Sequence, residues 1–176
     1  MRKLKLQELN RVDTKTFKEQ PKTPVVLVLD NIRSGLNVGS AFRTADGFGL
    51  EKIYLCGITA TPPHREILKT AIGASAAVEW EYSKTTLDAI LLLKKEGYQL
   101  IAIEQIDESI LLQDFELDKN QKYALIFGNE VTGVSDEILE HLDAAIEVPQ
   151  VGTKHSFNIS VCVGIVAWDF FKKIKY

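Results

Sequence analysis

The chain lacks long apolar segments and has little cysteine. Its longest apolar runs, such as AILLL at residues 89–93, are far shorter than the roughly 20 residues needed to cross a bilayer. The N-terminus MRKLKLQELN also lacks the apolar stretch of a signal peptide, so we expect a cytoplasmic protein. Cys56 and Cys162 lie in the apolar stretches IYLCG and ISVCVG, which favour reduced, buried thiols over a disulfide or a catalytic role.

Several common ligand-binding motifs are absent as well. The sequence has no GxxxxGKS/T phosphate loop, no GxGxxG turn after an expected strand, and no His/Cys cluster with the spacing of a metal site. Nucleoside triphosphate, dinucleotide and zinc chemistry therefore lose support, and no metal is expected.

The composition is that of one globular domain. At 176 residues, with 45% hydrophobic and 26% charged residues, the chain can bury a sizeable core. The net charge of −3 argues against bulk coating of nucleic acid, but residues 1–22 hold seven Lys/Arg against three Asp/Glu, or +4, which leaves −7 for the rest. This basic arm, taken as residues 1–23, is either an electrostatic footprint for a polyanion or a solvated helix of mixed charge.

Strand-like and helix-like segments alternate after the arm. β-Branched or apolar runs at 24–30, 52–57, 99–105, 123–128 and 144–149 predict buried strands. Helical patterns occupy 38–48, 83–96 and 135–141, and the mostly apolar segment 157–174 predicts a final helix buried against the sheet or another subunit. The alternation predicts an α/β fold with a parallel sheet, whose ligands bind at the carboxyl ends of the strands.

Three polar, glycine-containing loops follow expected strands and form the candidate site. In the first, NIRSGLNVGS, Asn37 is expected to cap the next helix and Gly39 to allow another chain segment close to it. Arg43 lies on the polar face of that helix, where its guanidinium can hold a phosphate, with Arg33 as a weaker candidate. The alternative is a surface ion pair between Arg43 and Asp46.

The second and third loops are FGNEVTG and PQVGTKHSFN. Glu130 follows a buried strand and needs hydrogen-bond partners, which a capped turn can supply without any ligand. Ser156 and Asn158 precede the last helix, where free N–H groups gather, so helix capping by Ser156 is an alternative to a site role. His155 has no identifiable acid partner and is expected to be a neighbour rather than a base.

The three loops together are more specific than each alone. N-x5-R-T-A, F-G-N-E-x-x-G and P-x-x-G-x-x-x-S-x-N, in that order, resemble the three motifs of the SpoU/TrmH-like RNA ribose methyltransferases of the SPOUT superfamily. The resemblance covers about residues 24–174.

The resemblance implies a parallel-sheet SPOUT-type fold with a C-terminal deep trefoil knot at roughly 123–165, within a domain of residues 24–176 that forms a homodimer. It also implies S-adenosylmethionine held in the knot mainly by backbone groups. The implied cofactor-binding residues are Ile103, Glu104, Ile126, Gly128, Val148, Ser156 and Phe157. Phe157 departs from the family, which usually has leucine there.

The implied reaction is methyl transfer to a ribose 2′-hydroxyl of tRNA or rRNA. The matching catalytic positions are Arg43, Asn37, Glu130, Ser156 and Asn158. Because an arginine with a pKa above about 12 is a poor general base, we interpret Arg43 as binding the adjacent phosphate, while Asn37 and Asn158 fix the geometry. Arg43 acts either in its own chain or toward a cofactor bound by the partner chain.

Two other functions remain compatible with the sequence. One is a non-catalytic RNA-binding module that keeps the fold, and the other is an α/β enzyme that acts on a small nucleotide without RNA. The complete set of polar motif residues favours the methyltransferase over both.

Overall fold

The computed structural model describes residues 1–176, except for the side chain of Leu6. The strands are β1 (Thr23–Asp30), β2 (Leu50–Cys56), β3 (Trp80–Ser83), β4 (Tyr98–Ile103), β5 (Ile110–Leu111), β6 (Lys122–Phe127) and β7 (Ala144–Glu147). The α-helices are α1 (Thr14–Glu19), α2 (Gly35–Phe48), α3 (Arg65–Ala71), α4 (Ala74–Ala77), α5 (Thr86–Lys95) and α6 (Ile159–Lys175). The 3-10 helices are η1 (Leu6–Leu9) and η2 (Asp136–His141).

The strands form one seven-stranded sheet in the order β3-β2-β1-β6-β4-β7-β5, and every pairing is parallel. The expected α/β fold with a parallel sheet is therefore confirmed. The five expected strands are all present, whereas β3 and β5 were not expected from the sequence.

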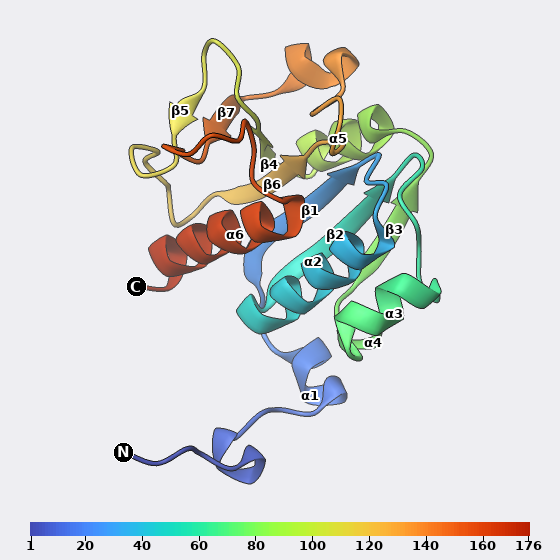
Figure 1. Ribbon diagram of the computed structural model, residues 1–176, viewed down its shortest axis with the longest axis vertical. Coiled ribbons are helices and arrows are strands. Elements are labelled where there is room, and N and C mark those ends of the chain that lie inside the picture. The colour runs from blue at the N-terminus through green and yellow to red at the C-terminus, as the bar shows by residue number, and fades with distance from the viewer.

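Helices cover both faces of the sheet (Figure 1). Alternate residues of β1 face opposite ways, because successive side chains of a strand point to opposite faces. Leu27 joins a core cluster with α2, α3 and α6, while Val28 joins a second cluster with α5 and η2. β1 is thus buried on both sides, which explains its continuous apolar sequence.

Two expected helix caps differ in the structure. Ser34, rather than Asn37, caps α2 by accepting a hydrogen bond from the Asn37 backbone N–H, so Asn37 lies inside the first turn. Asn158, rather than Ser156, caps α6 by accepting from the Ser160 N–H. Both helices therefore begin where a short polar side chain is available, but the capping residue lies three positions before the expected one in α2 and two positions after it in α6.

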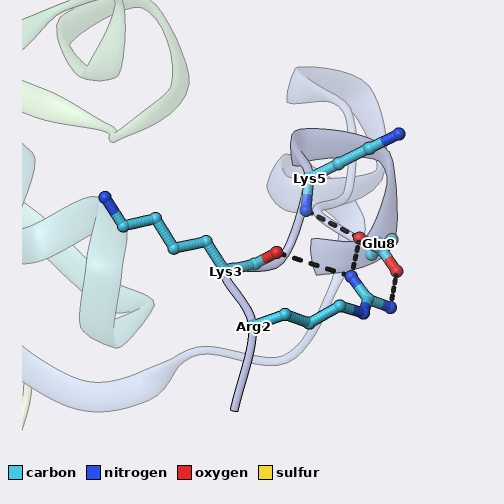
Figure 2. A network of polar contacts seen from close by, with 4 residues as sticks. All are labelled: Arg2, Lys3, Lys5 and Glu8. Atoms are coloured by element: carbon cyan, nitrogen blue, oxygen red, sulfur yellow. Dashed lines mark hydrogen bonds and ion pairs between the residues drawn. The ribbon is translucent and has the colours of Figure 1, made fainter.

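The N-terminal arm extends away from the sheet (Figure 1). Its described side chains before Phe17 are all exposed, whereas Phe17 in α1 is buried in the core cluster beside α4. Arg2 forms a two-point ion pair with Glu8, with N···O distances of 2.6 and 2.9 Å (Figure 2). No helix in the described part of the chain has both the length and the hydropathy that a membrane crossing requires.

Candidate functional site

The three candidate loops meet at one edge of the sheet. They follow β1, β6 and β7, and parallel strands have their carboxyl ends at the same edge. The β1 and β6 strands are direct neighbours, and β4 lies between β6 and β7. The sheet order therefore brings together segments that are more than 90 residues apart in the sequence.

Glu130 joins the second loop to the first. Its carboxylate accepts hydrogen bonds from the Arg33 N–H at 2.9 Å, the Ser34 N–H at 3.2 Å and the Asn37 side-chain amide at 3.0 Å. Partial burial alone would raise the pKa of Glu130, but these hydrogen bonds to the charged form outweigh it and lower the pKa. Glu130 is therefore held as a carboxylate at the start of α2.

Asn37 extends this connection to the third loop. Its side-chain oxygen faces the Asn158 amide nitrogen at 3.4 Å, and Asn158 caps α6. One chain of hydrogen bonds, Glu130–Asn37–Asn158, thus links all three loops, and we call it the motif network. It joins three of the five residues predicted to be catalytic.

Three residues to which the sequence analysis gave no individual role also hold the site together. The Asn129 amide donates to the Asn31 carbonyl at 2.6 Å, while its oxygen accepts from the Val131 N–H at 2.8 Å. Asn31 has a left-handed φ of 55°, and fully buried Asp30 accepts from the Ser135 N–H at 2.8 Å. The sequence signal for this role was the pair Asp30 and Asn31, two polar residues at the end of an apolar strand.

Two glycines of the second loop are required by close packing. A Cβ on Gly128 would lie 2.1 Å from backbone atoms of Gly133 and Val134. A Cβ on Gly133, whose φ is +72°, would lie 2.3 Å from a carboxylate oxygen of Glu104. The same oxygen accepts from the Val134 N–H at 3.0 Å, so Glu104 after β4 fixes the loop after β6.

The loops enclose a cavity of about 430 Å³, within the range of small-molecule and cofactor sites. Six of the seven residues predicted to bind the cofactor line it: Ile103, Glu104, Gly128, Val148, Ser156 and Phe157. Ile126 does not line the cavity, because its side chain is fully buried in the core cluster on the α5 side of the sheet. Of the predicted catalytic residues, Glu130, Ser156 and Asn158 lie on the cavity wall.

The cavity lining combines an apolar wall with carboxylates. Phe127, Ile146 and Cys162 are among its apolar members, and Glu104, Glu130 and Glu147 supply negative charge. Burial raises the pKa of the Cys162 thiol to about 11, so this side chain is neutral at pH 7. Such a lining suits a flat heteroaromatic group attached to a cationic centre. No group of three or more His, Cys, Asp or Glu side chains in the described residues is placed to hold a metal.

Arg43 lies outside this cavity in its own chain. Its exposed side chain lines a second, open hollow of about 530 Å³ between α2, α3 and α6. The alternative ion pair with Asp46 is not among the ion pairs of the described chain. Arg33 uses its backbone, rather than its guanidinium, to contact the motif network. His155 contributes only its carbonyl, which accepts from Gln105 at 2.9 Å.

Comparison with known proteins identifies the family. The SpoU rRNA Methylase family matches residues 24–168, and the chain therefore belongs to this family. The tRNA (guanosine(18)-2′-O)-methyltransferase of Borreliella burgdorferi is 30% identical over 151 residues, which cover 86% of this chain and 67% of that protein. The enzyme with the same name in Escherichia coli K12 is 27% identical, over 82% of this chain and 62% of its own length.

Solved structures have the same fold. The S-adenosylmethionine-bound rRNA methyltransferase of Sinorhizobium meliloti superimposes with a TM-score of 0.79 at 25% identity, over 90% of this chain and 59% of that one. The TrmH/SpoU tRNA-modifying enzyme of Aquifex aeolicus gives a TM-score of 0.78 at 25% identity, over 91% and 79%. The chain thus spans between about three fifths and four fifths of the length of these four relatives.

Proposed function

We propose that this chain is an RNA 2′-O-ribose methyltransferase that uses S-adenosylmethionine and acts on tRNA or rRNA. The observation that carries the proposal is the motif network, which joins the three family motifs at the rim of one cavity. The relatives named above are tRNA and rRNA methyltransferases, and one of them was solved with S-adenosylmethionine bound.

The cavity fits S-adenosylmethionine by the chemistry of its lining. The apolar wall suits adenine, while Glu104, Glu130 and Glu147 complement the ammonium and sulfonium charges. When bound, the cofactor supplies a methyl group on a sulfonium that is already activated. The chain therefore has to orient the ribose hydroxyl rather than to activate the methyl group. We assign cofactor contacts to Gly128, Val148, Ser156 and Phe157, and to the backbone near Ile103 and Ile126.

The proposed catalytic residues act by binding and orientation. Glu130 is fixed as an anion, and it holds Asn37 so that Asn37 in turn meets Asn158. Ser156 lies exposed on the cavity wall, where its hydroxyl can contact the ribose or the cofactor. Arg43 is the phosphate-binding residue, because a guanidinium remains protonated and presents a fork of donors.

We also propose that the active site is completed in a homodimer. Val161, Ile165 and Trp168 repeat at helical spacing along α6, and Val161 and Trp168 are 50% and 48% exposed. Gly164 on the same helix lines the hollow that contains Arg43. A partner that docks on this part of α6 would bring its own cofactor cavity toward Arg43.

The proposed knot and domain division belong to the same interpretation. A trefoil knot over roughly residues 123–165 would include β6, β7, the start of α6 and the loops between them, and this segment contributes most of the cavity wall. The family match begins at residue 24, which supports a basic arm of residues 1–23 ahead of the methyltransferase domain. Within that arm, Arg2 forms its ion pair with Glu8 (Figure 2).

The non-catalytic RNA-binding alternative is distinguished by cofactor uptake. The methyltransferase should bind S-adenosylmethionine in isothermal titration calorimetry and transfer its labelled methyl group to host RNA that lacks 2′-O-methylation. A binding module without activity would incorporate no label into tRNA or rRNA, and that result would refute the proposed function.

A further inference from the structure

The second hollow has the composition of an anion site. Its lining includes two cations, Arg43 from α2 and Lys69 from α3, and no carboxylate. Neither cation forms an ion pair within the described residues. The nearby carboxylate of Asp46 interacts instead with Lys22. Burial lowers the pKa of Lys22, and the negative charge of Asp46 partly offsets this effect. Two cations therefore share one concave surface without an internal counter-ion.

Close packing of α2 and α3 fixes the backbone position of Lys69. A Cβ on Gly39 would lie 2.4 Å from the Ile67 carbonyl and 2.1 Å from the Thr70 hydroxyl oxygen. Thr70 also donates to the Leu36 carbonyl at 2.9 Å, which ties the end of α3 to the start of α2. The helix that carries Lys69 is thus held against the helix that carries Arg43.

The rim of the hollow includes a strained apolar residue. Ile72 ends α3 with a φ of +47°, in the left-handed region that β-branched residues rarely adopt, and its side chain is 68% exposed. Strained residues of this kind cluster at functional sites. An exposed isoleucine next to two cations offers an apolar contact for a ribose beside a phosphate.

We infer that the hollow binds one phosphodiester of the RNA substrate, with Lys69 and Arg43 as its two cationic contacts. This inference rests on the proposed function and extends it by a second phosphate-binding residue. Arg43 is presented on the rigid helix α2, where it can also align the reacting ribose. Lys69, a more flexible point charge, contributes to RNA binding and not to the chemical step.

The test compares Lys69→Ala with Lys69→Arg and with a matched control, Lys95→Ala. Lys95 is an exposed lysine on α5, on the opposite face of the sheet, and it forms no ion pair within the described chain. RNA binding is measured by filter binding at several salt concentrations, with host tRNA and rRNA that lack 2′-O-methylation. Methyl transfer is measured on the same RNA.

Lys69→Ala should raise the KM for RNA about 5- to 20-fold, the range for loss of an exposed charge-assisted hydrogen bond, and leave kcat within about twofold. It should also make the slope of log K against log salt less steep by about 0.7, the value for one phosphate of a single strand. Lys69→Arg should restore most of the affinity for RNA. Lys95→Ala should leave the affinity for RNA unchanged, and none of these substitutions should change the affinity for S-adenosylmethionine.

Equal RNA affinities and equal salt slopes for Lys69→Ala and Lys95→Ala in filter binding would overturn the inference. Because filter binding needs no turnover, this comparison decides the role of Lys69 even if the wild type transfers no methyl group. Absence of transfer by the wild type would instead refute the proposed function, so the two failures are distinguishable.

Discussion

Replacing Glu130 with glutamine tests the motif network at its centre. The carboxylate has three donors around it, and one of its oxygens receives only the Arg33 N–H. The glutamine oxygen can keep the Ser34 and Asn37 donors, but its NH2 group then faces the Arg33 N–H. The substitution therefore removes one charge-assisted hydrogen bond and the negative charge beside the start of α2.

The cost can be estimated from these two losses. A hydrogen bond to a charged group contributes about 1.5–3 kcal/mol, and Glu130 falls at the low end because its side chain is exposed. A charge near a helix N-terminus adds about 0.3–1 kcal/mol. We expect Glu130→Gln to lower the free energy of unfolding by about 2 kcal/mol, which for a chain of this size lowers Tm by roughly 4–8 °C.

The pH dependence provides an independent check. The folded-state pKa of Glu130 lies below its ordinary value of 4.5, so its stabilisation is complete above that value and is lost as the pH falls through the folded pKa. Thermal denaturation of the wild type and Glu130→Gln should show the full difference at pH 7 and a smaller one below about pH 4.5. Glu108→Gln, at an exposed position without a polar partner within the described chain, serves as the control. Equal Tm values for Glu130→Gln and wild type at pH 7, or a difference that grows as the pH falls, would refute the reasoning.

Four further substitutions test other parts of the structure. Arg43→Ala should abolish most methyl transfer while leaving the affinity for S-adenosylmethionine unchanged by calorimetry, because Arg43 lies outside the cofactor cavity; loss of both would make its role structural. Gly128→Ala should destabilise the fold by about 2 kcal/mol or more and weaken cofactor binding, because its Cβ would clash with backbone atoms. Gly47→Ala in α2 should instead stabilise the fold by about 0.5–1 kcal/mol, because its Cβ would meet nothing within 4 Å. Equal chemical denaturation midpoints for these two glycine variants would contradict the close approach at Gly128. Ile72→Gly should raise Tm by relieving the strain of the left-handed backbone conformation. A lowered Tm would show that the contacts of the isoleucine side chain stabilise the fold by more than this strain destabilises it.

The local sequence pattern was sufficient to predict the central strands. Residues 24–30 and 123–128 are continuous apolar runs because β1 and β6 are buried on both faces. A run of this kind is typical of a central strand in a parallel sheet. The edge strand β3 was missed because its four residues WEYS are partly or fully exposed, and β5 has only two residues. Short edge strands contain too few apolar residues to be recognised from the sequence.

The site was predictable as a set of loops but not as a set of contacts. The order of the motifs identified Asn37, Glu130 and Asn158, yet the contact between Asn37 and Glu130 spans 93 positions and depends on β1 pairing with β6. Helix capping was misassigned because Ser34 and Asn37 are both suitable acceptors near the start of α2, and only the backbone conformation distinguishes them. Lys69 had no local signal, since its relation to Arg43 arises from the packing of α2 on α3.

The most direct test of the proposed reaction is where the methyl group is attached. RNA labelled by the protein with radioactive S-adenosylmethionine is hydrolysed in alkali, which needs a free 2′-hydroxyl to cleave the adjoining phosphodiester bond. Transfer to a ribose 2′-hydroxyl predicts that the label remains in alkali-resistant dinucleotides. Label in mononucleotides, which indicates a methylated base, or no label in RNA at all, would contradict the account.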